Sequence, residues 1–113
     1  MSVFIVRNLS EAEPQKRLCG RIWSLSNSED FEEGNLSYFE ASRPARPHYH
    51  KETTEMYFVI SGRGKILVDK SEERLKRGTF VMIRPSTVHR VIPDEGSILK
   101  IVVCSIPAWK EED

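Results

Sequence analysis

The chain has no excess charge of either sign, because its 113 residues include 17 basic and 17 acidic side chains. Binding to nucleic acid through phosphates needs a cationic surplus, so we expect no nucleic-acid partner. No apolar run approaches the roughly 20 residues that span a bilayer, and residues 1–10 lack the features of a secretory signal. We therefore predict a cytoplasmic protein with no membrane partner.

Cysteine is also scarce, with two residues in the whole sequence. Cys19 and Cys104 lie far apart and belong to no CxxC or zinc-ribbon spacing. In a reducing compartment we expect two free thiols that serve as small buried apolar residues. A disulfide between them is the alternative.

Helical periodicity is almost absent, because Pro14 limits the one candidate turn at residues 9–16. Short segments rich in β-branched and aromatic residues recur instead, separated by turn residues, which is typical of an all-β protein. We predict one domain over residues 1–113, built as a sandwich or barrel. The predicted strands are residues 3–7, 17–26, 36–41, 47–50, 55–60, 64–68, 73–76, 79–83, 88–92 and 98–106.

A barrel of this length has room inside for one small ligand or ion, and none for a separate substrate domain. The edge strands of such a fold are often paired between subunits. We therefore expect a homodimer, with residues 3–7 as the candidate strand at its interface.

Histidine occurs three times, and two of these residues, His48 and His50, are separated by a single position. On a strand both imidazoles would lie on one face, where two neutral rings can bind one metal ion. Glu55 opens a run of apolar residues, and a divalent cation would offset the cost of burying its carboxylate. Side-chain parity changes between His50 and Glu55, so residues 51–54 must turn or bulge.

These residues resemble the two motifs of the cupin superfamily. His48-Tyr49-His50, then four residues, Glu55, then six residues and Gly62 match the first motif, over about residues 42–62. Gly78 and His89, eleven residues apart, match the second, over about residues 78–93. Four residues at motif positions that are not metal ligands differ from the usual pattern: Ser42, Arg84, Ser86 and Pro93.

The resemblance implies a single cupin domain, that is, a double-stranded β-helix or jelly-roll barrel. It also implies that His48, His50, Glu55 and His89 bind one divalent transition-metal ion per chain. The residue types suit Mn, Fe, Co, Ni, Cu or Zn, and the sequence does not choose between these metals.

Several residues near the motifs are candidates for the surrounding pocket. Glu55 is the candidate catalytic base, and Tyr57 shares its side of the strand as a second catalytic candidate. Arg46 is the candidate for binding an anionic group of the substrate, with a solvated rim as the alternative. Tyr38, Phe80 and Met82 are expected to line the cavity, with Phe80 and Met82 as plain core residues in the alternative interpretation.

Fold alone does not fix function. We expect a metal-dependent enzyme, a dioxygenase or a sugar isomerase or epimerase, that acts on a small oxygen-rich or anionic substrate. One alternative is a non-catalytic module that binds a metal or a small ligand. Another is a dimer in which the metal only supports folding.

Overall fold

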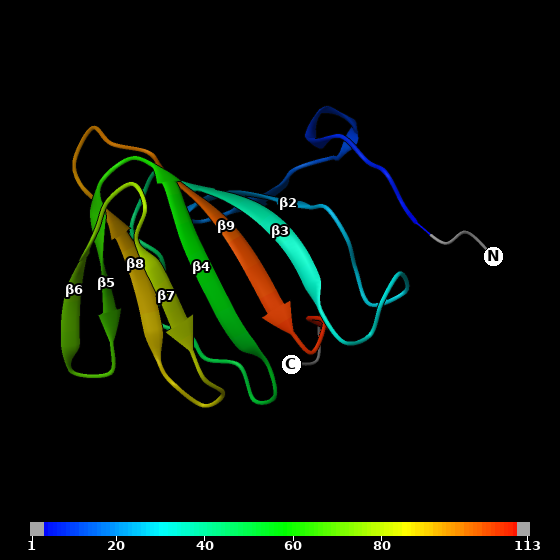
Figure 1. Cartoon of the computed structure of the whole chain (residues 1–113). Coiled ribbons are helices and arrows are strands. Elements are labelled where there is room, and N and C mark those ends of the chain that lie inside the picture. The colour runs from blue at the N-terminus through cyan, green and yellow to red at the C-terminus, as the bar shows by residue number, and fades with distance from the viewer. Residues whose placement is uncertain (1–3, 111–113) are drawn as a thin grey trace.

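The computed structural model describes residues 4–110 and is built almost entirely of β-strands (Figure 1). A short 3-10 helix, η1 (Leu9–Glu11), begins at a capping box formed by Asn8 and Glu11. The strands of the described residues are β1 (Gln15–Arg17), β2 (Gly20–Ser24), β3 (Asn35–Ala41), β4 (Thr54–Ser61), β5 (Gly64–Val68), β6 (Ser71–Leu75), β7 (Phe80–Ile83), β8 (His89–Pro93) and β9 (Leu99–Ile106).

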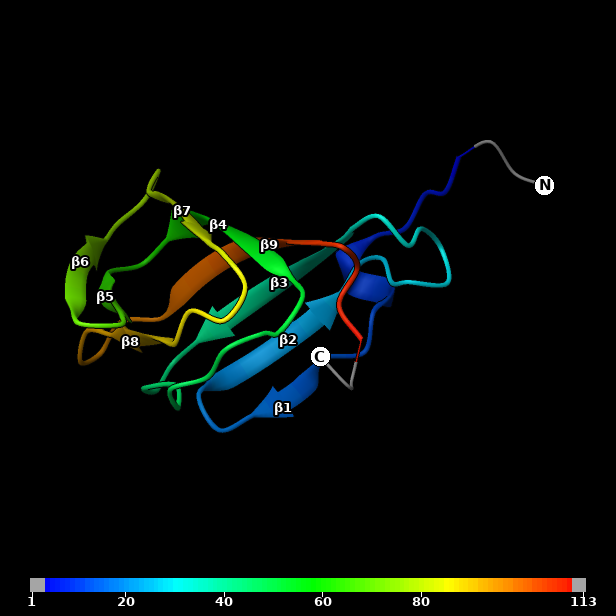
Figure 2. The ribbon, with the colours of Figure 1, turned by 90° about the horizontal axis from the view of Figure 1, so that it is seen from below.

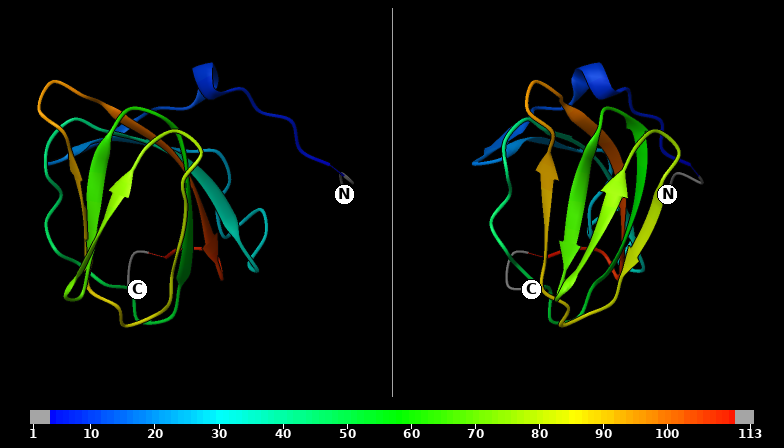
Figure 3. Two further views of the ribbon diagram at one scale, coloured as in Figure 1. Left: turned by 60° about the vertical axis from the view of Figure 1, so that its left-hand side comes forward. Right: turned by 90° about the vertical axis from the view of Figure 1, so that its left-hand side faces the viewer.

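The strands form two antiparallel sheets. One has six strands in the order β1-β2-β3-β9-β4-β7, and the other has three in the order β6-β5-β8. The two sheets enclose a common interior, with β5, β6 and β8 opposite the broad face of β3, β9 and β4 (Figures 2 and 3). The prediction of an all-β jelly-roll barrel is confirmed. No helix of the described residues is long and apolar enough to cross a membrane.

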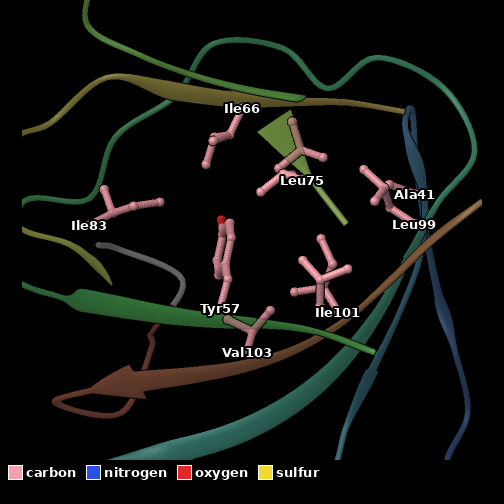
Figure 4. Close-up of a cluster of buried hydrophobic side chains, with 10 residues drawn as sticks. Ala41, Tyr57, Ile66, Leu75, Ile83, Leu99, Ile101 and Val103 are labelled. Atoms are coloured by element: carbon pink, nitrogen blue, oxygen red, sulfur yellow. The ribbon is translucent and has the colours of Figure 1, made fainter. Parts of the chain in front are cut away.

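The apolar core fills one end of the interior. On β9, Leu99 and Ile101 are fully buried, and they pair in register with Ala41 and Phe39 of β3. Figure 4 shows Ile66 and Leu75 approaching this group from the opposite sheet. Toward the other end, the buried residues of β3 and β9 become polar: they are Asn35, Ser37 and Ser105. The strands thus bring polar side chains to one end of the barrel and apolar side chains to the other.

Gly62 allows the chain to pass from one sheet to the other between β4 and β5. Its φ is +89°, in the region that favours glycine. An added Cβ atom would collide with the carbonyl of Ile98. A glycine is therefore required at this crossing by both backbone conformation and space.

Three predicted strands differ from the structure. Residues 47–50 form only an isolated bridge at His48, because Pro44 and Pro47 interrupt regular pairing. Residues 17–26 divide into β1 and β2 around a tight turn at Leu18 and Cys19. Residues 4–7 form no strand and extend away from the barrel (Figure 3), while residue 3 lies outside the described residues. Cys19 and Cys104 are free thiols, as predicted.

Candidate metal centre

A short β-bridge joins the two sequence motifs. The amide of His48 donates to the carbonyl of His89 at 3.0 Å, and the amide of His89 donates to the carbonyl of His48 at 2.9 Å. His89 begins β8 in the three-stranded sheet, whereas Glu55 lies near the start of β4 in the six-stranded sheet. The bridge therefore fixes the loop that carries His48 and His50 between the two sheets.

The four predicted ligands come together at this point. One donor atom from each of His48, His50, Glu55 and His89 lies within 4.8 Å of the others. Oε1 of Glu55 is 3.3 Å from Nε2 of His50 and 3.2 Å from Nε2 of His89. Glu55 and His89 are buried, and His50 is partly buried. As predicted, residues 51–54 turn so that Glu55 points inward.

Backbone carbonyls orient two of the imidazoles. Nδ1 of His48 lies 3.0 Å from the carbonyl oxygen of Arg46, and Nδ1 of His89 lies 2.9 Å from that of Thr87. Because a carbonyl only accepts hydrogen bonds, each Nδ1 carries a proton, and the neutral ring then directs its Nε2 lone pair toward the cluster.

The donor set fits a divalent metal ion. In neutral His89 the Nε2 lone pair faces a carboxylate oxygen of Glu55 only 3.2 Å away. Two such lone pairs repel one another unless a cation lies beside them. Three imidazoles and one carboxylate are suitable ligands for a first-row transition metal, with coordination positions left over. The residues present therefore fit the ion that the sequence predicts.

The electrostatics of the cluster favour the protonation states that metal binding needs. Partial burial lowers the pKa of His48, and the nearby His89 lowers it further, against the hydrogen bond to Arg46. Burial opposes ionisation of Glu55, but in metal-free protein hydrogen bonds donated by the protonated Nε2 atoms of His50 and His89 outweigh it and lower the pKa of Glu55 to about 2. At neutral pH the cluster thus offers a neutral His48 ring and a charged carboxylate.

Tyr57 lies directly behind Glu55 on the same face of β4. Its hydroxyl donates a hydrogen bond of 3.1 Å to Oε1 of Glu55. Burial raises the pKa of the Tyr57 phenol well above its ordinary value, and the Glu55 charge raises it further. Tyr57 is therefore a protonated donor across the ordinary pH range.

A cavity of about 980 Å³ extends from the cluster over the inner face of the six-stranded sheet, and among the described lining residues only Val91 comes from the three-stranded sheet. Arg46, the predicted anion-binding residue, lines this cavity. Many other polar or amphipathic lining residues were not predicted, among them Arg17, Asn35, Ser37, Ser105, Trp109 and Lys110. For Ser37 and Ser105, inward alternation along β3 and β9 is the signal that would have found them.

Tyr38, Phe80 and Met82 do not line the cavity, and their predicted placement is wrong. Phe80 and Met82 are 57% and 47% exposed, because the inward positions of β7 are those of Val81 and Ile83. Tyr38 lies on the outer face of β3, where its hydroxyl donates to Glu40 at 2.8 Å. In each case the side chain lies on the alternate face from the one predicted.

The comparisons with known proteins agree with the architecture. The family model described as "Cupin domain" matches residues 31–104. An uncharacterized protein of Methanocaldococcus jannaschii is 33% identical over 66 residues, which cover 58% of this chain and 53% of that protein. The chain thus matches about half the length of this curated relative.

Solved structures with the same fold are more distant in sequence. A protein from Planctomyces limnophilus has a TM-score of 0.89 and 22% identity, covering 99% of this chain and 96% of that one. A predicted oxalate decarboxylase from Thermotoga maritima has a TM-score of 0.81 and 15% identity, with coverage of 91% and 99%. The ectoine synthase from P. lautus has a TM-score of 0.84 and 16% identity, with coverage of 95% and 80%. At these identities the similarity shows the fold alone.

Proposed function

The chain belongs to the cupin family, and we propose that it is a metal-dependent enzyme acting on a small oxygen-rich or anionic substrate. The proposed ligands are His48, His50, Glu55 and His89, holding one divalent transition-metal ion per chain. The observation that carries the proposal is the position of the Glu55 carboxylate, buried between the Nε2 atoms of His50 and His89. The proposed domain spans the whole chain, and its proposed location is the cytoplasm.

A Mn, Fe, Co, Ni, Cu or Zn ion held by these residues would supply Lewis acidity and open positions for substrate oxygens. The neutral rings of His48 and His89 would direct Nε2 toward the proposed metal position, because backbone carbonyls accept hydrogen bonds from their Nδ1 atoms. The apolar core closes the barrel on the far side of the cluster. Such a site suits a dioxygenase or a sugar isomerase or epimerase.

Glu55 and Tyr57 are the proposed catalytic pair. Tyr57 donates to Oε1 and so fixes the orientation of the carboxylate beside the cavity. The contacts with His50 and His89 hold the pKa of Glu55 at about 2. That value describes metal-free protein. As a ligand of the proposed ion, Glu55 would accept a substrate proton only when its coordination loosens, because a base is most effective when its pKa lies near the working pH.

The test is elemental analysis of untagged protein beside the His48→Ala/His50→Ala variant, followed by a screen of diols, keto acids and oxygen uptake. The proposal expects near-stoichiometric metal in the native chain, none in the variant, and turnover that depends on the metal. Absence of metal from the native chain after reconstitution contradicts it. Bound metal without turnover favours the alternative of a non-catalytic metal- or ligand-binding module.

We further propose a homodimer formed through the outer face of the six-stranded sheet. On this face Phe58 pairs with Phe80 and Met56 pairs with Met82 across β4 and β7, and Val102 of β9 continues the first row. Phe58, Phe80 and Met82 are 47–57% exposed. Exposed apolar patches of this kind commonly mark protein interfaces.

The edge of this face favours a second copy of the same chain as its partner. Arg21, Glu40 and Lys100 lie next to one another in the adjoining row of the sheet. Both signs of charge therefore border the apolar rows. A two-fold axis through the face can place basic residues of one subunit opposite acidic residues of the other.

A further inference from the structure

Three cationic side chains line the cavity. These are Arg17, Arg46 and Lys110, and among the described lining residues Glu55 is the only carboxylate. The whole chain balances 17 basic against 17 acidic residues, so this positive excess is local. The charge of Glu55 is already engaged by two imidazoles. The cavity is therefore suited to a ligand with negative charge.

Arg17 and Arg46 keep their charge available, whereas Lys110 also borders a second hollow lined by Glu29, Asp30, Glu32 and Glu33. Within residues 4–110, none of the three forms an ion pair with a carboxylate. The guanidinium of Arg17 donates only to the neutral amide of Gln15, at 2.9 Å. By contrast, the exposed Arg74 binds Asp94 through two hydrogen bonds of 3.1 and 2.6 Å. A carboxylate or phosphate could occupy the equivalent positions around a cavity arginine.

Hydroxyl groups line the cavity beside Glu55. Ser37 and Ser105 are only 7% and 4% exposed. Ser105 of β9 pairs in register with Glu55 of β4, so their side chains emerge next to one another on the inner face. In the described part of the chain, no group accepts a hydrogen bond from the Ser105 hydroxyl. Ser37 Oγ accepts a long hydrogen bond of 3.4 Å from Asn35, which leaves its own proton to be donated.

Buried hydroxyl groups normally have partners, because an unpaired one loses the hydrogen bonds that water would provide. Ser37 and Ser105 instead line a cavity, where a bound molecule can supply those partners. Oxygen atoms of a ligand are the natural acceptors and donors at this position. The inner end of the cavity is thus suited to hydroxyl groups, and the cations to an anion.

We propose that the cavity binds a small anionic polyol, a molecule that carries both free hydroxyl groups and one carboxylate or phosphate. Its anionic group is held by Arg17, Arg46 and Lys110, and its hydroxyl groups by Ser37 and Ser105. The inference rests on the proposed function, of which it names the substrate class. A neutral polyol would leave the cations without a partner, and a fatty acid would leave the serine hydroxyls without one.

Calorimetric titration of the full chain with four probes tests the inference. D-gluconate and D-glucose 6-phosphate carry hydroxyls with a carboxylate or a phosphate, D-glucitol carries only hydroxyls, and hexanoate carries only the anion. Both Mn²⁺-loaded and metal-free protein are titrated. At least one anionic polyol is expected to bind about tenfold more tightly than glucitol and hexanoate, and the tighter of the two identifies the anion. Equal affinity for all four probes, or binding of neither anionic polyol, overturns the inference.

Variants test whether the cationic residues bind the anionic group and whether the serines bind the hydroxyl groups. Arg46→Gln, alone and with Arg17→Gln, is expected to lower the affinity for the anionic polyols about tenfold per arginine. The affinity for glucitol should stay unchanged. Ser105→Ala is expected to lower the affinities for gluconate and glucitol together and to leave the affinity for hexanoate unchanged. Arg77→Gln and Ser71→Ala are the matched controls, because both residues are exposed and lie outside the cavity lining. If Arg46→Gln and Arg77→Gln bind gluconate equally well, the cationic half of the inference is wrong.

The same experiment separates this inference from the proposed function. A chain that holds no metal but still prefers the anionic polyols contradicts the metal-dependent enzyme and supports the ligand class. A chain that holds metal but binds glucitol as tightly as gluconate supports the metal centre and contradicts the proposed ligand class. Thermal melts of each variant confirm that it is folded before its affinity is compared.

Discussion

Tyr57 and Glu55, two positions apart on β4, are joined by a 3.1 Å hydrogen bond from the phenol to Oε1 of the carboxylate. The same oxygen lies within 3.3 Å of Nε2 of both His50 and His89. The phenol thus contacts the proposed ligand from the side of the apolar core. Its position makes Tyr57 an orienting group for the proposed metal centre as well as a candidate catalytic residue.

Tyr57→Phe removes this hydrogen bond and keeps the aromatic ring in the core. Loss of a group that orients a ligand commonly costs 10–100-fold in metal affinity, and we expect about tenfold here. Competition with a fluorescent chelator measures it. Tyr49→Phe is the control, because Tyr49 lies between the two histidines and is 51% exposed. Equal metal affinity in the two variants would show that the phenol does not orient Glu55.

The lowered pKa of His48 predicts how stability depends on pH in metal-free protein. In the unfolded chain a histidine titrates near pH 6.5, whereas folding favours the neutral form of His48. Its contribution to the free energy of unfolding is therefore complete above about pH 6.5 and is lost as the pH falls through the lower folded-state value. Thermal melts between pH 5 and 8 measure this slope. His48→Gln should flatten it, and an unchanged slope contradicts the assignment.

Gly62 and Gly78 both have positive φ, but only Gly62 is crowded. Gly78→Ala is expected to cost about 1 kcal/mol, from backbone conformation alone. Gly62→Ala adds a collision with the Ile98 carbonyl and should cost about 3 kcal/mol or more. Urea denaturation of the two variants compares these costs. Similar free energies of unfolding would show that the crossing between the sheets relaxes freely.

The proposed dimer can be tested on its apolar face. Phe58→Ser/Phe80→Ser is expected to convert the dimer to a folded monomer, because it removes two large exposed side chains that lie side by side. Size-exclusion chromatography with light scattering gives the mass. Phe31→Ser is the control, since Phe31 is 58% exposed but lies in the loop before β3. A monomeric native chain at micromolar concentration excludes the proposed interface.

The sequence predicted best where local spacing carries the information. Two-residue alternation placed Glu55 and Tyr57 on one face of β4, and the structure buries both. The juxtaposition of the four ligands was implied by the resemblance to the cupin motifs, because no local spacing relates His89 to the other three residues.

Predictions that depend on contacts between distant segments were less successful. Phe80 and Met82 were assigned to the wrong face, because a shift of one residue exchanges the two sides of a strand. Residues 47–50 were predicted as a strand, but Pro44 and Pro47 limit their pairing with β8 to a single bridge. Arg17 reaches the cavity only because β1 folds back on β2, which no short-range pattern reveals.

The position of the cluster between two sheets has a thermodynamic consequence. Glu55 belongs to the six-stranded sheet and His89 to the three-stranded one, so a metal bound by both would act as a cross-link across the interior. Its affinity would then depend on the distance between the sheets. By reciprocity, a ligand that widens the barrel would lower the affinity for the metal. The bound metal would lower the affinity for that ligand by the same factor. Retention of the metal would in this way limit the size of the molecules that the barrel accepts.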